Sequence, residues 1–347
     1  MINIRIATDY DEFIWQNYCQ KKVVDNHAYY WPWRSIIRSI FSHKPCYLLA
    51  LDSNLVVGIA PLFFVNSFLF GRALVSVPYL NAGGIIADNQ EVSDLLISKC
   101  RELANSREVN YAELRQRTAI NSSADNLILR QHKVAMLLPL SHDAEILFDS
   151  FPAKLRSQIN RPIKEGVTVK VSQGYDSQAI EDFYYIFCRN MRDLGIPVYP
   201  RALFAKTAEL FAAQVLVVIA YQGERPVAAG FLIGAGKYLE ILWASSLRSE
   251  NYYSPNMLMY WEAIKAACQQ GYEIFDFGRS SPDSGTFHFK QQWGAQPLTL
   301  NWQYLGSSVL PEISNKNAKF SLLSKMWQKL PLPLANTLGS SLTKHLP

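Results

Sequence analysis

Hydrophobic and polar positions follow a pattern that occurs twice along the chain. Residues 46–60 form two short apolar segments around a polar turn, and residues 215–233 repeat that arrangement. Two apolar runs separated by turn-forming residues predict a β-hairpin. Gly58 and Gly230 occupy matching positions just after the two turns. The match suggests that the two segments are copies of one hairpin.

The pattern that follows each hairpin also repeats. Residues 91–107 carry apolar side chains at helical spacing, and a strand is predicted at 109–114. In the second half a Ser-Pro pair at 254–255 begins a helix, and Gly271 ends it before a strand at 272–277. Duplication of one mixed α/β domain is the simplest explanation.

We therefore predict an α/β fold with mixed α+β sheets, in which two duplicated domains are followed by a helical tail. The length of 347 residues agrees with two domains at about 150 residues each. We place the first domain at 1–145, the second domain with the main site at 146–306, and the tail at 307–347.

The tail predicts a helix at 318–330 that ends before Pro331. Residues 310–347 contain five lysines and one acid, so most of the net charge of +5 lies there. We expect this helix to pack on the first domain. The alternative, a basic amphipathic helix that contacts an anionic membrane surface, stays open. The apolar stripe of the helix consists of Phe320, Leu323, Met326, Trp327 and Leu330.

Composition and motifs exclude several classes of protein. The chain is 49% hydrophobic and 18% charged, which is typical of globular proteins. It begins without a signal-peptide pattern and has no apolar run that would span a bilayer, so we expect a cytoplasmic protein. The five cysteines are far apart, which favours reduced, buried thiols over disulfides or zinc. Catalytic-serine, metalloprotease and P-loop motifs are absent, and we expect neither a metal nor DNA as a ligand.

The densest group of chemically useful residues lies at 275–295. A strand ends there, a turn-rich loop follows, and Asp283 or Ser284 caps a short helix that carries Phe289 and Lys290. Polar residues gathered at a strand end mark the place where α/β sheets bind ligands. The alternative for the lysine is a solvated surface position. The residues expected to gather at this strand end are Arg279, Ser280, Thr286 and Lys290.

Three further segments supply candidate binding residues. A basic helix at 153–166 places two polar side chains one turn apart, where they can share a phosphate or a sugar hydroxyl. A loop at 78–88 has a glycine pair that lets its backbone approach a ligand, and a loop at 190–200 either closes over an acceptor or packs. For each segment the alternative is a purely structural role. The candidates are Arg156, Asn160, Tyr79, Asn81 and Tyr199.

Segment 275–295, followed by Asn-Trp-Gln-Tyr at 301–304, resembles the signature of the FemAB-like branch of the GNAT superfamily. The resemblance is to FemAB-related proteins of PEP-CTERM/exosortase and exopolysaccharide systems. It implies tandem GNAT-like domains and an acyl- or aminoacyltransferase that forms an amide on an amine of a cell-envelope or exopolysaccharide precursor. Further matching stretches lie at 76–88, 154–166, 190–200, 243–246 and 254–256.

The resemblance also implies catalytic roles for Phe289 and Lys290. Many GNAT enzymes have a short helix of the form F-Y-x-x-x-G-F, and residues 289–294 have that frame with lysine in the tyrosine position. In FemAB-type transferases a Phe-Lys pair at this place is implied to stabilise the reacting aminoacyl ester. A fixed ammonium group stabilises an oxyanion that develops during aminolysis.

The donor is an open choice between aminoacyl-tRNA and acyl-CoA, with no permanently bound cofactor. CoA-dependent GNAT enzymes usually carry a glycine-rich loop before the helix that receives the pyrophosphate, whereas residues 247–256 contain no glycine. The helix start at Ser254 and Asn256 still offers backbone N–H groups to an anionic group of the donor.

The expected acceptor is an amine-bearing glycan or peptidoglycan precursor, and peripheral contact with the inner face of the membrane stays open. One alternative is a CoA-dependent N-acetyltransferase of an amino sugar. The other is a non-catalytic scaffold that binds a glycan precursor or a partner; in a scaffold, the pocket beside Lys290 is free to be closed or apolar.

Overall fold

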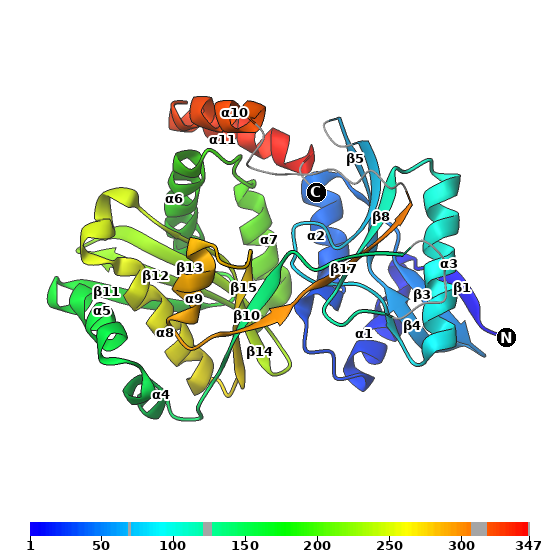
Figure 1. The fold of residues 1–347 in the computed structure, drawn as a ribbon, viewed down its shortest axis with the longest axis horizontal. Coiled ribbons are helices and arrows are strands. Elements are labelled where there is room, and N and C mark those ends of the chain that lie inside the picture. Colours follow the sequence, from blue (N-terminus) through cyan, green and yellow to red (C-terminus); the bar gives the residue numbers. More distant parts are fainter. Residues whose placement is uncertain (69–70, 121–126, 307–317, 346–347) are drawn as a thin grey trace. The chain divides into compact units, whose positions relative to one another are not determined.

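The computed structural model describes residues 1–68, 71–120, 127–306 and 318–345. These residues form two compact units (Figure 1). Of the described residues, 1–134, 299–306 and 344–345 belong to the first unit, and 135–298 and 318–343 belong to the second.

The first unit contains a four-stranded and a six-stranded sheet. The four-stranded sheet has the order β1 (Asn3–Ile6), β3 (Leu48–Asp52), β4 (Leu55–Ala60) and β7 (Ile86–Ala87). The six-stranded sheet has the order β2 (Lys44–Pro45), β5 (Leu62–Ser67), β6 (Gly71–Ser76), β8 (Tyr111–Gln116), β17 (Asn301–Gly306) and β9 (Ile128–Arg130). Its helices are α1 (Glu12–Lys21), α2 (Pro32–Phe41) and α3 (Gln90–Ser106).

The second unit has one seven-stranded sheet with helices on both faces. The sheet has the order β11 (Val167–Gln173), β12 (Val215–Gln222), β13 (Arg225–Ala235), β14 (Tyr238–Ser246), β15 (Ile274–Ser280), β10 (Val134–Pro139) and β16 (Gln296–Thr299). The helices are α4 (Ala144–Ser150), α5 (Ala153–Lys164), α6 (Ser177–Leu194), α7 (Arg201–Phe211), α8 (Pro255–Gln269), α9 (Gly285–Gln291), α10 (Ala318–Gln328) and α11 (Leu332–Leu342).

Two neighbouring residues of β13 show why the helices cover opposite faces of this sheet. Phe231 packs against Phe183 of α6, at 5.5 Å between ring centroids. A Cβ added to Gly230 would meet Met259 of α8 at 2.9 Å. Since successive strand residues point to opposite faces, α6 and α8 lie on opposite sides.

The duplicated architecture is confirmed. The two predicted hairpins are β3–β4 and β12–β13, and each half contains a helix that joins two parallel strands: α3 joins β6 to β8, and α8 joins β14 to β15. The paired glycines have the same use. A Cβ on Gly58 would meet Val92 of α3 at 2.6 Å, as one on Gly230 would meet Met259 of α8. Glycine at both positions lets a helix approach the hairpin closely.

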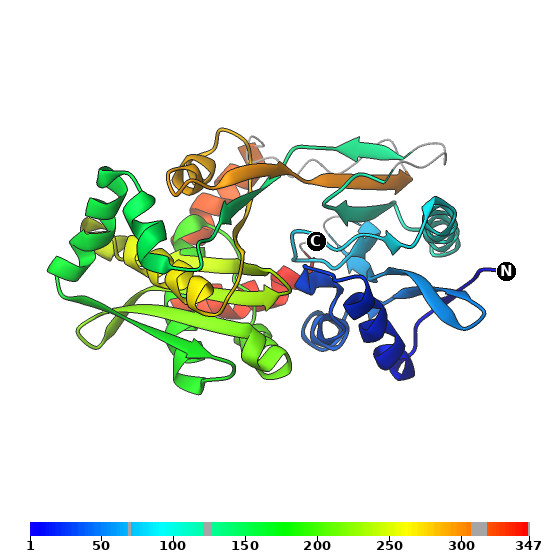
Figure 2. The same ribbon diagram turned by 90° about the horizontal axis from the view of Figure 1, so that it is seen from below.

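The domain boundaries differ from those expected, because two strands are exchanged between the halves. β10, placed at the end of the first domain from the sequence, belongs to the seven-stranded sheet of the second unit. β17, placed in the second domain, pairs with β8 in the first unit, from Asn301–Gln116 to Gly306–Tyr111. Figure 2 shows β17, in orange, between β8 and β9. Strand pairing across a long sequence separation is invisible to local pattern analysis.

The tail packs on the second unit, which corrects the expectation that it packs on the first. Both α10 and α11 contact α6, and Figure 1 shows them over that helix. The inward face of α11 consists of small residues: Ala335 is 2% exposed, and a Cβ on Gly339 would meet the Val198 backbone nitrogen at 2.7 Å. Close approach by small residues therefore fixes α11 to this unit.

The predicted apolar stripe of the tail does not enter a core. Leu323 and Met326 are each 60% exposed, whereas Trp327 and Leu330 are half-buried. The side chain of Phe320 and residues 307–317 lie outside the described part of the chain.

Other sequence expectations concern the thiols and membrane spans. All five cysteines are free and buried. Within the described ranges, we find no helix with the length and apolarity that crossing a bilayer requires.

Candidate functional site

The two parallel strands of the second unit pair over only part of their length. The β14–β15 ladder runs from Tyr238–Ile274 to Glu240–Asp276, whereas β14 continues to Ser246 and β15 to Ser280. In addition, the register between β13 and β14 shifts at Phe231, where β14 contains one extra residue. Such a bulge bends a strand. The carboxyl ends of β14 and β15 therefore separate.

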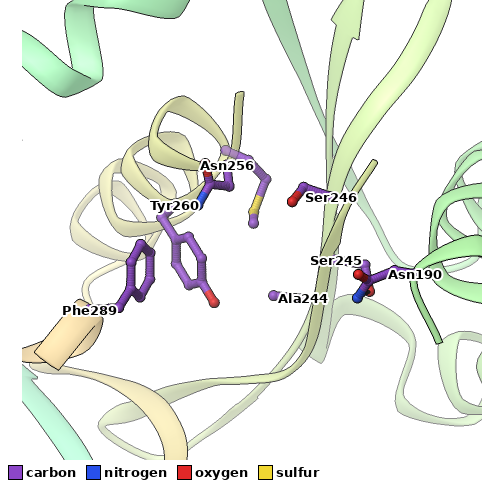
Figure 3. Close-up of a pocket in the computed structure, with 8 residues that line it drawn as sticks. Asn190, Ala244, Ser245, Ser246, Asn256, Tyr260 and Phe289 are labelled. Carbon is purple, nitrogen blue, oxygen red and sulfur yellow. Dashed lines mark hydrogen bonds between the residues drawn. The ribbon is translucent and has the colours of Figure 1, made fainter. Parts of the chain in front are cut away.

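A pocket of about 170 Å³ lies beside the carboxyl end of β14 (Figure 3). The first two turns of α8 form another wall, and one residue each from α6 and α9 completes the lining. Its position at the carboxyl ends of the strands is the one where α/β sheets bind ligands. The lining residues are Asn190, Ala244, Ser245, Ser246, Asn256, Met259, Tyr260 and Phe289.

Tyr260 supplies a hydroxyl group to the pocket. Its ring packs against Phe277, Phe289 and Trp293, with centroid distances of 5.6, 5.1 and 6.2 Å. Figure 3 shows the hydroxyl pointing away from α8 into the space between Phe289 and Ala244. Burial raises the pKa of this hydroxyl, so it keeps its proton at neutral pH. Tyr260 is thus a rigid hydrogen-bond donor.

Asn190 and Ser245 form the polar wall opposite Tyr260. Asn190 Nδ2 donates a hydrogen bond to Ser245 Oγ at 3.0 Å, which ties α6 to β14. Ser246 and Asn256 add a hydroxyl and an amide to the lining. All eight lining residues are neutral at neutral pH. A small, neutral, polar group fits this chemistry.

Lys290 of α9 is buried, with only 7% of its surface exposed. It follows the pocket residue Phe289 in the chain but does not itself line the pocket. Its Nζ donates hydrogen bonds to the carbonyl oxygens of Gly278, at 3.0 Å, and Arg279, at 2.9 Å. The short helix is capped by Ser284, whose Oγ accepts from the Phe287 N–H, as expected. The ammonium group is therefore held in one place at the end of β15.

Two buried carboxylates, those of Asp276 and Glu240, act on the Lys290 ammonium group. Burial lowers the pKa of Lys290 to about 8, and the negative charges of Asp276 and Glu240 oppose that shift. Asp276 is 1% exposed and accepts a hydrogen bond from the Gly278 N–H at 2.8 Å. Lys290 and Asp276 thus fix both sides of the Gly278 backbone.

The structure brings the strand-end candidates together in part. Lys290 binds the Arg279 backbone, but the Arg279 side chain is exposed. Ser280 is 3% exposed, and its hydroxyl has no hydrogen-bond partner among the described residues. Thr286 is exposed at the start of α9, at 3.0 Å from the Ser284 hydroxyl.

The start of α8 differs from the expected cap. Pro255 is the first helical residue as expected, but Ser254 has a left-handed φ of 56° and its side chain caps nothing. Asn256 reaches the pocket instead. A 3-10 helix at Arg248–Tyr253 leads into this start.

Within that 3-10 helix, Glu250 is only 9% exposed. It accepts hydrogen bonds from Tyr253 and Ser249 and pairs with Arg225 at 2.9 Å. The hydrogen bond from Tyr253 lowers the pKa of Glu250, which keeps the group ionised at neutral pH. Glu250 and Arg225 therefore form an ion pair just before α8.

The remaining candidates lie away from the pocket lining. On α5, Arg156 donates to the Asp149 carbonyl oxygen at 2.9 Å and Asn160 is exposed. Tyr199 packs on Trp243, one residue before the pocket residue Ala244, at 6.0 Å between centroids. These three residues belong to the second unit.

Tyr79 and Asn81 belong to the first unit. The Tyr79 hydroxyl lies 2.6 Å from His43 Nε2, and its ring packs against that of Phe41 at 4.1 Å between centroids. The Asn81 carbonyl oxygen accepts a hydrogen bond from Trp302 at 3.3 Å. The packed environment fits the structural alternative for this loop.

Sequence reasoning placed Phe289 and Asn256 at the site but missed most of the pocket wall. The Trp-Ala-Ser-Ser segment at 243–246 was noted only as part of the family resemblance, and the 190–200 segment was a candidate through Tyr199 and not through Asn190. Tyr260 carried no local signal, because it looks like one more aromatic residue of an apolar helix. In the described part of the chain, no cluster of three or more metal-ligating side chains is found.

Comparisons with known proteins show which families and folds the chain resembles. Residues 151–291 match the family model described as Acetyltransferase (GNAT) domain. Over 166 residues the chain is 25% identical to a UDP-N-acetylmuramoylpentapeptide-lysine N(6)-alanyltransferase of Weissella viridescens, a match that covers 46% of this chain and 48% of that protein. The chain thus spans about half the length of this relative.

Two solved structures share the fold across most of the chain. The crystal structure of FemX has a TM-score of 0.62 and 14% identity, and the match covers 87% of this chain and 96% of that one. A tandem GNAT protein from the clavulanic acid biosynthesis pathway has a TM-score of 0.55 and 10% identity, with 89% and 100% covered.

The chain therefore has the fold of tandem GNAT proteins, and its second half contains a GNAT acetyltransferase domain. The domain match and the alanyltransferase relative support an N-acyl- or aminoacyltransferase.

Proposed function

We propose that this protein transfers an aminoacyl or acyl group to an amine of a cell-envelope precursor and so forms an amide bond. The observation that carries the proposal is the neutral, polar pocket at the separating ends of β14 and β15, one wall of which is Phe289 of α9. The next residue of that helix, Lys290, holds a buried ammonium group at the end of β15. An activated carbonyl group of the donor enters this pocket, and the acceptor amine attacks it there. The C–N bond forms, the C–O bond of an ester or the C–S bond of a thioester breaks, the amine releases one proton to solvent, and the leaving alcohol or thiol takes one up.

Two side chains are assigned chemical roles in this reaction. The Lys290 ammonium, which Gly278 and Arg279 hold in place, offsets the negative charge that develops on the carbonyl oxygen. The protonated Tyr260 hydroxyl donates a hydrogen bond to that oxygen or a proton to the leaving oxygen or sulfur. Phe289 packs against the ring of Tyr260 and holds its direction.

The donor is proposed to be an aminoacyl ester such as the end of an aminoacyl-tRNA. CoA-dependent GNAT enzymes usually carry a glycine-rich loop before the helix that receives the pyrophosphate, whereas residues 247–256, which precede α8, contain no glycine, which disfavours CoA. The exposed Arg279 side chain and the backbone at Ser254 are the proposed contacts for a terminal phosphate group.

The acceptor is proposed to be an amine on a peptidoglycan precursor. The name of the Weissella relative describes transfer of an alanyl group to lysine N6 of UDP-N-acetylmuramoylpentapeptide. An exopolysaccharide precursor with an amine is the second candidate. Arg156, Asn160 and Tyr199 are the proposed acceptor contacts, and all three belong to the second unit.

A polar pocket disfavours the non-catalytic scaffold. A scaffold has no need for a buried lysine of lowered pKa, because burial of an ammonium group costs stability. The place of the protein at the inner face of the membrane is a separate proposal that rests on the tail.

Transfer assays with two donors test this proposal. We expect the full chain to move a radiolabelled alanyl group from alanyl-tRNA to UDP-N-acetylmuramoylpentapeptide, with the amide confirmed by mass spectrometry. Tyr260→Phe should lower the transfer rate by about 100-fold, because general acids contribute at least that factor. Tyr175→Phe, at an exposed tyrosine of the same unit, is the matched control.

Two results would contradict the proposal in different ways. Acetyl transfer from acetyl-CoA without transfer from alanyl-tRNA would favour the CoA-dependent enzyme. Absence of transfer from both donors to amine-bearing precursors, with binding of those precursors retained, would favour the scaffold.

A further inference from the structure

The tail hairpin, α10 and α11, is packed with its small residues inward and its large apolar residues outward. Ala335 and Gly339 face the second unit, and Ser324 Oγ donates to the Leu194 carbonyl oxygen of α6 at 3.4 Å. The outward residues are Leu322, Leu323, Met326, Leu334 and Leu338, which are between 47% and 61% exposed.

This arrangement is unusual for a helix that only completes a fold. A helix on a globular unit normally buries its large apolar side chains and exposes its polar ones. Contiguous exposed apolar surface marks a place of interaction with a protein or a membrane. The outward side chains on α10 lie at positions i, i+1 and i+4, and those on α11 at i and i+4, so each helix presents one apolar face.

The charge of the hairpin selects the partner. Residues 318–343 contain three lysines and no acid, and Lys325 and Lys329 are exposed next to the apolar residues of α10. Anionic lipid headgroups attract such a surface. A second copy of the same hairpin would bring lysine against lysine, which opposes self-association through this face.

The lengths of the two helices also fit binding to a membrane surface better than crossing a membrane. Each helix has 11 residues, so each is about 16 Å long, which is half of a bilayer core. Helices of this kind lie in the interface with their apolar side chains below the headgroups.

We propose that α10 and α11 dock the protein onto an anionic membrane surface, with the leucines and Met326 inserted and Lys325 and Lys329 against the headgroups. This docking is independent of the transfer reaction. It would bring the pocket of the same unit to a membrane that carries envelope precursors.

Co-sedimentation of the full chain with vesicles tests the docking. We expect the protein to sediment with vesicles of equal parts phosphatidylglycerol and phosphatidylcholine, and far less with phosphatidylcholine alone. Leu322→Ser, Leu323→Ser and Met326→Ser together should weaken partitioning at least about tenfold. Lys325→Gln and Lys329→Gln should each weaken it about fivefold.

The substituted residues are exposed, so the variants should unfold at the same temperature as the unmodified protein. Leu210→Ser, at a leucine of α7 that is 44% exposed, is the matched control and should sediment normally. Equal sedimentation of the triple variant, or failure of the unmodified protein to sediment, would overturn the proposal. So would size-exclusion data in which the unmodified protein is a dimer and the triple variant a monomer. Transfer assays in solution are a separate readout, so failure of docking and failure of the transferase function are distinguishable.

Discussion

The two halves repeat one crossover but differ where its parallel strands separate. In the first unit the β6–β8 ladder ends at Val75–Glu113, and the next residues are held together by Arg115. Its backbone N–H donates to Ser76 Oγ at 2.7 Å, and its side chain donates to Glu113 at 2.5 Å and to the Leu80 carbonyl oxygen at 2.7 Å. The corresponding place in the second unit is the polar pocket.

The difference shows how a duplicated fold divides its tasks. The buried Arg115 closes the separation of the strands in the first unit and stacks on Trp302 of the exchanged strand β17, at 4.6 Å. In the second unit Lys290 uses backbone carbonyl groups at the strand end and leaves the pocket open. We therefore expect disruption of the first site to affect stability, and disruption of the second to affect transfer.

The largest expected effect is the loss of stability when Arg115 is removed from the strand ends of the first unit. Arg115→Ala leaves Glu113 buried without its partner, and removal of one member of a buried ion pair costs about 3–5 kcal/mol. Urea unfolding followed by circular dichroism measures the loss. Lys99→Ala, which breaks the exposed pair with Glu102, is the control and should cost under about 1 kcal/mol. A similar, small loss for both variants would show that Arg115 does not hold the first site closed.

Next in size is the effect of Lys290 on transfer. Lys290→Ala should lower kcat by about 100- to 1000-fold, the effect of removing one group that stabilises an oxyanion. Because the variant also leaves the Gly278 and Arg279 carbonyl groups without their donor, thermal unfolding must be measured in parallel. Lys290→Arg keeps the charge and should retain more activity than the alanine variant. A folded Lys290→Ala protein with full turnover would remove lysine from the mechanism.

The two matching glycines separate stability from transfer more finely. Gly58→Ala meets two side chains of α3, at 2.6 and 2.9 Å, and should destabilise the protein by about 1–3 kcal/mol. Gly230→Ala meets the flexible side chains of Met259 at 2.9 Å and Ile241 at 3.0 Å, which is less tight than the 2.6 Å contact of Gly58, so it should cost less stability. Since Met259 lines the pocket, Gly230→Ala should still lower transfer. Denaturant midpoints and initial transfer rates of both variants test this. Equal loss of transfer in both would contradict the claim that the first unit supports stability and the second supports transfer.

The smallest expected effect is that of pH. Lys290 has a pKa of about 8 in the fold against its usual 10.5, so its charge is lost as the pH rises through 8. Turnover that needs the ammonium should fall up to about tenfold per pH unit above 8, and Lys290→Arg should abolish that decline. Stability should move the other way: the unfolded chain binds more protons between pH 8 and 10.5, so the contribution of this group to stability rises across that window. A pH profile that is identical for the two proteins would contradict the role.

Local patterns in the sequence were enough to predict the repeated hairpins, the crossover helices and the capped helix that carries Lys290. Each of these depends on residues close together in the chain, such as Ser284 and the Phe287 N–H that it caps. The pocket depends on distant residues. Asn190 and Ser245, which share a hydrogen bond, are far apart in sequence and lie on different elements, so their meeting follows from the sheet as a whole.

The predictions for the exchanged strands and for the tail were wrong for a related reason. β17 finds its partner β8 through a pairing of high sequence separation, and no period in either strand specifies that choice. The tail packs through Ala335 and Gly339, whereas pattern analysis assigns the buried face to the larger residues. Alanine and glycine contribute little to a hydrophobic pattern, so a face that packs through them is not predicted as buried.

Filling the pocket tests the central claim most directly. Ala244→Phe places a ring in the space of about 170 Å³ and leaves Lys290 and Tyr260 unchanged. Ala213→Phe, at an exposed alanine of the same unit, is the control. We predict that transfer from alanyl-tRNA falls at least about 100-fold in Ala244→Phe and is unchanged in Ala213→Phe, because a displaced donor carbonyl is no longer within reach of the amine. Normal transfer by a folded Ala244→Phe protein would contradict the claim that the donor group occupies this pocket.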